Sequence, residues 1–354
     1  MKRICTKCIV AALILSMGIT AGIPAYAAQP QTTAATEQAA QLSLEETASQ
    51  YFENYPSDKH VVSAEQLLNR VEEGESFCLL DIRSAEDYAK GHIQGAVNIP
   101  YGLDVADALE TIPNDQPVLV YCYSGQTASQ TVALLRLAGK DAYNVSGGFT
   151  GISKQEKAKQ LTVKTETALP EGNYPVDPQL KQAIREYYEL AAQSGKFNMS
   201  AEQVKKEASE GKIYLVDIRS ENDYLKSRIS FAKENIPFGK GMQTALANLP
   251  KDQKIVFQCY SGQTASQTVA IARMMGLDAY NLSGGMGAKG GSGWLGAGYH
   301  VVKYSTQQFL NAKVDRYFKN LPENKNQLSA AAFLAAVEDK EDAGILDIHS
   351  AEDY

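Results

Sequence analysis

The chain has 354 residues, with 34 lysines and arginines against 41 aspartates and glutamates, and a formal net charge of −7 at pH 7. At about 100 to 200 residues per domain, this length predicts two or three domains with enough material for a core in each. The composition is 44% hydrophobic and 21% charged, which argues against a disordered or fibrous chain. The acidic balance, without a long basic run, predicts no nucleic-acid partner.

The N-terminal segment has the order of a targeting sequence. Its first seven residues carry three basic side chains, Ile9–Ile23 form an apolar run, and Ala25–Ala27 have a small-x-small pattern. This order predicts a secretory signal peptide over residues 1–27. An uncleaved anchor is the alternative, because the apolar run approaches the length that spans a bilayer. With cleavage, we expect a secreted or extracytoplasmic protein without a stable membrane span. The cell surface is one such location.

Short apolar runs alternate with helical patterns in the next part of the chain. Strands are predicted at Phe77–Ile82, Val97–Ile99, Val118–Cys122 and Ala142–Val145. Thr127–Ala138 has helical periodicity. Strands that alternate with helices predict an α/β fold, in which a mainly parallel sheet has helices on both faces. In such sheets ligands bind beyond the carboxyl ends of the strands, and Cys122 and Cys259 are predicted to lie there.

The chain repeats itself. Leu79–Tyr88 returns as Leu215–Tyr224 and again as Ile345–Tyr354, and Tyr121–Ala133 returns as Gln258–Ala270. Corresponding residues of the first two copies are 136 or 137 positions apart, which is the length of a whole domain. The third copy reaches only its tyrosine, so we expect a third domain that begins without being completed, in a fragment of a longer chain.

Each copy follows a pair of aromatic residues: Tyr51-Phe52, Tyr187-Tyr188 and Tyr317-Phe318. Around the second pair, apolar residues follow helical spacing, so we expect a helix that precedes each domain and packs on it. A plain connector between domains is the alternative. The expected layout is a signal peptide (1–27), a linker and helix (28–56), domain 1 (57–152), a linker and helix (153–196), domain 2 (197–300), a connecting helix (301–324) and the start of an incomplete domain 3 (325–354).

Five cysteines occur, of which export leaves Cys78, Cys122 and Cys259. Three are too few for a disulfide scaffold, so the domains should be held by packing. Cys78 lies between Phe77 and Leu79 in a predicted strand, which favours an inert core thiol. No histidine and cysteine have the spacing of metal ligands, and neither a metal nor a cofactor is predicted.

The segment Cys122–Thr127 joins a predicted strand directly to a predicted helix. Gly125 permits a positive φ, which would turn successive amide N–H groups inward at the positive end of the helix dipole. These partial charges favour a thiolate at Cys122, and Ser124 can add a hydroxyl donor. A small buried cysteine at a strand end is the alternative. The identical stretch after Cys259 favours a nucleophile in both copies.

Both complete copies resemble rhodanese (thiosulfate sulfurtransferase) domains. The matching features are the Asp-Ile-Arg-x-x-x-Asp-Tyr block, Gly91–Pro100, the Cys-x-x-Gly-x-Thr loop and Ser146–Gly148. The resemblance implies tandem rhodanese-like domains, in which Cys122 and Cys259 take sulfane sulfur from a small sulfur-containing anion such as thiosulfate. A thiol acceptor or cyanide then removes that sulfur from the persulfide. The implied substrate-binding loops are Tyr123, Ser124, Gly125, Gln126 and Thr127, and Tyr260, Ser261, Gly262, Gln263 and Thr264.

Two departures from the family pattern stand out. Thr127 and Thr264 occupy the place where many family loops have an arginine, which weakens capture of an anionic donor. In the second copy, Ser227–Pro237 replaces the motif at Gly91–Pro100, so only partial equivalence of the two sites is expected.

Three polar side chains in each copy are predicted to be structural residues near the site. They are Asp81, Arg83 and Asp87 in the first copy and Asp217, Arg219 and Asp223 in the second. The arginine should pair with the later aspartate, and the earlier aspartate should cap backbone N–H groups. A direct role with substrate is the alternative.

The leading hypothesis is therefore an exported sulfurtransferase that works through cysteine persulfides. A phosphatase or arsenate reductase of the same fold would need an arginine in the loop, which neither loop has. A non-catalytic extracellular array for binding or sensing, without a known protein partner, is a further alternative. A redox pair of Cys122 and Cys259 would require the two loops to face each other.

Overall fold

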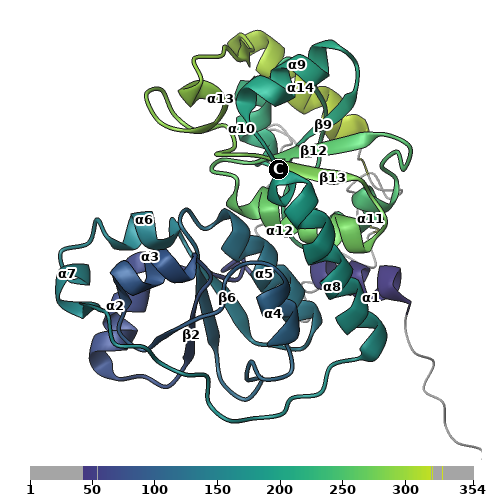
Figure 1. Ribbon diagram of the computed structural model, residues 1–354. Helices are drawn as coiled ribbons and strands as arrows, with labels where there is room; N and C mark the ends of the chain where they lie inside the picture. The colour runs from purple at the N-terminus through teal and green to yellow at the C-terminus, as the bar shows by residue number, and fades with distance from the viewer. Residues whose placement is uncertain (1–42, 54, 320, 322–328, 330–354) are drawn as a thin grey trace, which may run out of the picture. The chain divides into compact units, whose positions relative to one another are not determined.

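A computed structural model describes residues 43–53, 55–319, 321 and 329 (Figure 1). Both complete repeats lie within one compact unit. The predicted signal peptide and the predicted start of a third domain lie outside the described residues. No helix in the described part of the chain has the length and apolar character needed to cross a membrane.

The first repeat is built on a five-stranded sheet in which every pairing is parallel. Its strands are β1 (Val61–Val62), β2 (Cys78–Asp81), β4 (Ala96–Asn98), β5 (Val118–Tyr121) and β6 (Ala142–Val145). Their order across the sheet is β1-β6-β5-β2-β4. The prediction of a mainly parallel sheet is confirmed, and β5, which leads to Cys122, lies at its centre.

The second repeat has the same sheet. Its strands are β8 (Asn198–Met199), β9 (Ile213–Asp217), β11 (Ala232–Asn235), β12 (Lys254–Gln258) and β13 (Ala279–Leu282). All pairings are parallel, and the order β8-β13-β12-β9-β11 matches that of the first repeat strand for strand. Cys259 therefore follows the central strand of its sheet, as Cys122 does.

Helices follow the strands in both repeats. The first repeat has α2 (Ala64–Glu73), α3 (Ala85–Lys90), α4 (Leu103–Asp107), α5 (Gln126–Leu137), α6 (Gly148–Ile152) and α7 (Ala158–Leu161). The second has α9 (Ala201–Ser209), α10 (Glu221–Lys226), α11 (Met242–Ala247), α12 (Gln263–Met274) and α13 (Gly293–Gly296). Ser63 begins α2 in a capping box with Gln66, and Ser200 begins α9 in the same way with Gln203.

Alternate side chains of the central strands enter two different cores. Leu80 and Val120 belong to a large core that also contains Val216 and Phe257 of the second repeat. Leu79 and its neighbours on the opposite face pack under α2 and α6 in a core of the first repeat alone. The inner faces of the two sheets thus share one hydrophobic core, in which α5 and α12 pack against each other.

Each repeat closes with a short antiparallel pair outside its main sheet. In the first repeat, β3 (His92–Ile93) pairs with β7 (Thr162–Val163). In the second, β10 (Ser227–Arg228) pairs with β14 (Val302–Lys303). The replaced motif of the second copy therefore keeps the backbone pairing of the first, although its side chains differ.

The predicted helix before each repeat is present as α1 (Leu44–Glu53), α8 (Pro178–Gln193) and α14 (Thr306–Lys319). The apolar stripe of α8 is buried, as its spacing predicts. The expectation that each helix packs on the domain it precedes is confirmed only in part. Helix α1 packs mainly on α11 and α12 of the second repeat and less on α5 of the first, whereas α8 packs on α4 of the first repeat and, through Tyr187, on Phe197 of the second. Both helices bury apolar side chains in the core that the two repeats share.

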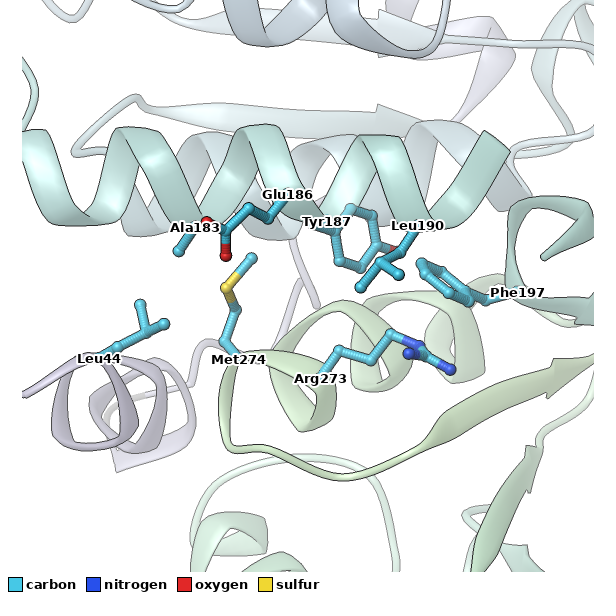
Figure 2. Close-up of a pocket in the computed structure, with 8 residues that line it drawn as sticks. All are labelled: Leu44, Ala183, Glu186, Tyr187, Leu190, Phe197, Arg273 and Met274. Atoms are coloured by element: carbon cyan, nitrogen blue, oxygen red, sulfur yellow. The ribbon is translucent and has the colours of Figure 1, made fainter. Parts of the chain in front are cut away.

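Polar contacts also link α8 to the first repeat and α1 to the second. Tyr188 of α8 shares a hydrogen bond of 3.1 Å with the Thr131 hydroxyl of α5, and Tyr51 of α1 donates to Gln267 Oε1 of α12 at 3.0 Å. Figure 2 shows where α8, the end of α12 and the start of α1 come together. The pocket there is lined by Leu44, Ala183, Glu186, Tyr187, Leu190, Phe197, Arg273 and Met274, and includes no residue of either cysteine loop.

Candidate active site

Cys122 and Cys259 occupy equivalent positions, each directly after the central strand of its sheet. Each residue is only 2% exposed, and both thiols are free. The carboxyl edge of a parallel sheet is where ligands bind in folds of this kind. The sequence prediction of their place in the fold is confirmed.

Backbone N–H groups are directed at both sulfur atoms. Gly125 donates to Cys122 Sγ at 3.1 Å, and Ala128, in the first turn of α5, donates at 3.4 Å. Gly262 donates to Cys259 Sγ at 3.1 Å. Gly125 and Gly262 both have a φ of 85°, in the left-handed region that favours glycine, and this backbone turn points the N–H groups at the sulfur. Such donors at a helix N-terminus stabilise negative charge on the sulfur.

A second turn holds the backbone of each cysteine loop from behind. Phe149 N–H donates to Cys122 O at 2.7 Å, and Met286 N–H donates to Cys259 O at 2.7 Å. Gly148 lies so close to the loop that a Cβ there would be 2.5 Å from Cys122 O. The Ser-Gly-Gly sequence therefore allows two backbone segments to approach more closely than side chains would permit.

The tyrosines after the cysteines stand at the surface. Tyr123 is 46% exposed and Tyr260 is 50% exposed. Their hydroxyls donate to Asp87 Oδ2 and Asp223 Oδ2, respectively, at 2.5 Å. The hydrogen bond from Tyr123, and after it the bond from Lys90, lowers the pKa of Asp87 to about 2. The tyrosines thus stand beside each loop and are fixed there by a carboxylate.

The predicted ion pairs of Arg83 with Asp87 and of Arg219 with Asp223 are wrong. The Arg83 guanidinium binds Asp81, with Nη2 at 2.6 Å from Oδ2, and Arg219 binds Asp217 at 2.7 Å. Both pairs are almost fully buried. Each arginine turns inward because it also donates to a backbone carbonyl, which for Arg83 is that of Gly91 at 2.8 Å. The cap predicted for the earlier aspartates is confirmed, since Asp81 Oδ1 accepts from Arg83 N–H at 2.9 Å and Asp217 Oδ1 accepts likewise in the second repeat.

Other loop side chains have local partners. Ser124 Oγ accepts from Gln126 Nε2 at 3.2 Å, and Ser261 Oγ accepts from Gln263 Nε2 at the same distance. Thr127 and Thr264 are half-buried in the first turns of α5 and α12. Gln126 and Gln263 also make contacts with the opposite repeat that the sequence pattern alone does not predict. Their presence at the same position in both copies was the available signal.

Cys78 differs from the two loop cysteines. It is buried in β2, and burial raises the pKa of its thiol to about 12. The prediction of an inert core thiol agrees with this position. Among the described residues, no group of three or more His, Cys, Asp or Glu side chains could hold a metal ion.

Comparison with known proteins identifies both repeats. The family model described as "Rhodanese-like domain" matches residues 63–155 and 200–288, more than half of the chain. The chain is 31% identical over 98 residues to the putative sulfurtransferase YtwF of Bacillus subtilis, which covers 28% of this chain and 94% of that protein. It is 38% identical over 72 residues to the thiosulfate sulfurtransferase GlpE of Pseudomonas fluorescens, covering 20% of this chain and 65% of that protein.

Other similarities are more partial. The chain is 34% identical over 95 residues to the HTH-type transcriptional regulator Rv0324 of Mycobacterium tuberculosis, covering 26% of this chain and 41% of the regulator. It thus spans less than two thirds of the length of this regulator and of GlpE. The solved structure of the 3-mercaptopyruvate sulfotransferase SseA of Escherichia coli matches with a TM-score of 0.32 and 17% identity, covering 64% of this chain and 98% of that one.

The repeated parallel sheets, the identical cysteine loops and the matched segments agree with one another. The chain belongs to the rhodanese-like domain family and contains two such domains in tandem.

Proposed function

We propose that this protein is an exported sulfurtransferase in which Cys122 and Cys259 carry sulfur as persulfides. The observation that carries the proposal is the set of N–H donors 3.1 to 3.4 Å from the two sulfur atoms. These groups stabilise a thiolate before the reaction and the outer sulfur of a persulfide after it. Cys78, by contrast, has a raised pKa and is suited only to packing.

The proposed cycle has two displacements. The thiolate attacks the sulfane sulfur of a donor such as thiosulfate, a new S–S bond forms on the cysteine, and sulfite leaves with the electron pair of the broken bond. An acceptor thiolate or cyanide then attacks the outer sulfur, and the cysteine thiolate is the leaving group. Two easier steps replace one difficult transfer, as in other covalent mechanisms.

The absence of Lys and Arg from residues 122–127 and 259–264 bears on the donor. In the described structure, Arg83 and Arg219 are taken up by buried aspartates. Backbone amides are therefore the donors that each loop offers to a negative group. This favours a donor that presents little charge beyond its reactive sulfur, and thiosulfate should load the protein with a high KM.

The test is sulfur loading followed by intact-mass measurement. After incubation with thiosulfate, the protein should gain up to two sulfur atoms, and cyanide should remove them as thiocyanate. Cys122→Ser and Cys259→Ser should each abolish one of these gains, and the double variant should abolish both. Cys78→Ser is the matched control and should load normally. Undiminished loading of the double variant would refute the assignment.

A non-catalytic binding or sensing array is the second candidate, favoured by the 2% exposure of each cysteine. It predicts that no variant and no wild-type sample gains sulfur from thiosulfate or from an organic persulfide. The redox-pair alternative has a separate signature in the same experiment, a mass loss of two hydrogens. Export is tested by comparing the mass of the secreted protein with that of the full chain.

A further inference from the structure

The N-terminal ends of α5 and α12 meet, and a glutamine from each reaches into the other repeat. Gln126 is the first residue of α5, and its Oε1 accepts from Asn281 Nδ2 at 2.9 Å and from Gly284 N–H at 3.1 Å. Gln263 is the first residue of α12, and its Oε1 accepts from Asn144 Nδ2 at 2.9 Å and from Gly147 N–H at 3.3 Å. The two sets of contacts are equivalent, residue for residue.

The backbone that receives each glutamine is the turn that holds the opposite cysteine loop. Gly284 belongs to the turn whose next residues, Met286 and Gly287, donate to Cys259 O at 2.7 Å and to Tyr260 O at 2.9 Å. Gly285, between Gly284 and Met286, is so close to the loop that a Cβ there would lie 2.5 Å from Cys259 O. A shift of this turn would therefore move the backbone of the Cys259 loop.

The same relation holds in the other direction. Gln263 binds Gly147, and the residues that follow, Phe149 and Thr150, donate to Cys122 O at 2.7 Å and to Tyr123 O at 3.0 Å. Asn144 is fully buried, as is Asn281 on the opposite side. A buried N–H group that loses its acceptor is unfavourable, so loss of the glutamine oxygen favours movement of the turn.

Each glutamine also divides its two amide atoms between the repeats. Gln126 Oε1 accepts from Gly284 N–H of the second repeat, whereas Gln126 Nε2 donates to Ser124 in its own cysteine loop at 3.2 Å. Packing is tight, since a Cβ on Gly262 would lie 2.4 Å from Gln126 Oε1. The side chain thus links the Cys122 loop to the support of the Cys259 loop.

We propose that Gln126 is a positioning residue for Cys259 and that Gln263 is a positioning residue for Cys122. Each sulfur site is then complete only when the other repeat is in place, and the two sites are coupled through the glutamine amides. This inference rests on the proposed function for its kinetic readout, but the positioning itself can be measured on the thiol alone.

The test uses chains with one loop cysteine. In the Cys122→Ser background, Gln126→Met keeps the length of the side chain and removes both polar atoms. Sulfur loading of Cys259 should slow by about tenfold, as expected for a small misplacement of a reacting group, and the pH profile of Cys259 alkylation by iodoacetamide should shift. Gln130→Met is the matched control in this background, because it makes the same change one turn further along α5, where the glutamine contacts Tyr101 and Lys196 rather than a cysteine loop, and Cys259 should be unaffected.

The mirror experiment uses the Cys259→Ser background, in which Gln263→Met should impair Cys122 and Gln267→Met, whose glutamine contacts Tyr51 and Lys59 O, should not. If Gln126→Met fails to fold, Gln126→Asn, whose amide is one methylene shorter, is put through the same comparison with the same expected result. An unchanged rate and pH profile of Cys259 in the glutamine variants would overturn the proposal.

The two proposals fail in distinguishable ways. If Cys259 takes up no sulfur even in the Cys122→Ser chain with Gln126 intact, the proposed function fails at that site. The alkylation profile then still reports whether Gln126 controls the surroundings of the Cys259 thiol. A shift confined to the glutamine variant supports positioning, and identical profiles in all variants refute it.

Discussion

In the first repeat, the Arg83 guanidinium stacks 3.7 Å from the centre of the Phe149 ring. In the second, Met286 stands at the corresponding position, and the aromatic ring near Arg219 is that of Tyr260, at 5.9 Å. Yet both loops place a glycine N–H 3.1 Å from the cysteine sulfur. The N–H donors keep their positions despite these side-chain differences because they belong to the backbone. The backbone geometry here depends on a glycine and on the start of a helix.

The segments that follow the Gly-Gly pair differ more strongly between the two repeats. After its Gly-Gly pair, the first repeat continues into α6 and α7. The second continues through a glycine-rich segment in which Trp294 is buried and donates from Nε1 to His300 O at 2.9 Å. The inner faces of the two sheets share one core, whereas each outer face packs in a core of its own repeat.

The largest expected effect comes from the buried ion pairs, which both repeats have. Arg219→Met leaves the carboxylate of Asp217 buried without its partner, and the free energy of unfolding should fall by about 3–5 kcal/mol. Arg83→Met should cost more than Arg219→Met, because it also removes the stacking on Phe149. Urea denaturation measures both. A larger loss in the second repeat would contradict the comparison.

A histidine in the first repeat stands where the second has Phe197. Burial, and after it the charge of Arg136, lowers the pKa of His60 from its ordinary 6.5 to about 4, against the opposing effects of Asp58 and Asp141. Between these two pKa values the unfolded chain binds more protons, so stability should be full above pH 6.5 and fall as the pH drops toward 4.

His60→Phe should remove this pH dependence of the stability and make the protein more stable than wild type by about 2 kcal/mol at about pH 5. The backbone should tolerate the change, since Phe197 has a φ of 55° where His60 has 52°. Thermal unfolding across this pH range is the measurement. Identical slopes for variant and wild type would show that His60 does not titrate with folding.

A smaller effect is expected at the residue before each cysteine. Tyr121 accepts a hydrogen bond from Ile93 N–H at 3.3 Å, whereas Gln258 is fully buried and both its amide atoms lack a partner in the described part of the chain. Gln258→Leu should therefore stabilise the protein by about 1–2 kcal/mol. Tyr121→Phe, its counterpart, should destabilise by about 1 kcal/mol, since it leaves that N–H unpaired. Stabilisation by both variants would break the contrast.

The central strands could be predicted because their apolar runs are long and uninterrupted. The strands β1 and β8 have two residues each, and only pairing with β6 and β13 defines them. The pairing of Arg83 with Asp87 is a wrong prediction because two aspartates lie near the arginine in sequence, and sequence alone does not show which way its side chain turns. Arg83 precedes α3, and its side chain turns inward to Asp81.

The cysteine loops could be located from sequence because strand, glycine and helix are adjacent there. The contacts of Gln126 and Gln263 could not, since they depend on how two similar surfaces meet. The same glutamine in both copies was one signal. Another was Ser129–Thr131, a polar run buried in α5, because buried polar side chains need partners. Gln130 donates to Lys196 O, between α8 and the second repeat, at 2.9 Å.

The packing of α1 and α8 against both repeats has a consequence for how such a chain can be shortened. The segments matched by the family model, 63–155 and 200–288, leave out both helices, so the unit of sequence repetition is smaller than the unit that buries its surface. A single repeat excised at those limits would lose the packing of α5 against α12 in the shared core. A shortened form of this chain should therefore keep both sheets together with α1 and α8.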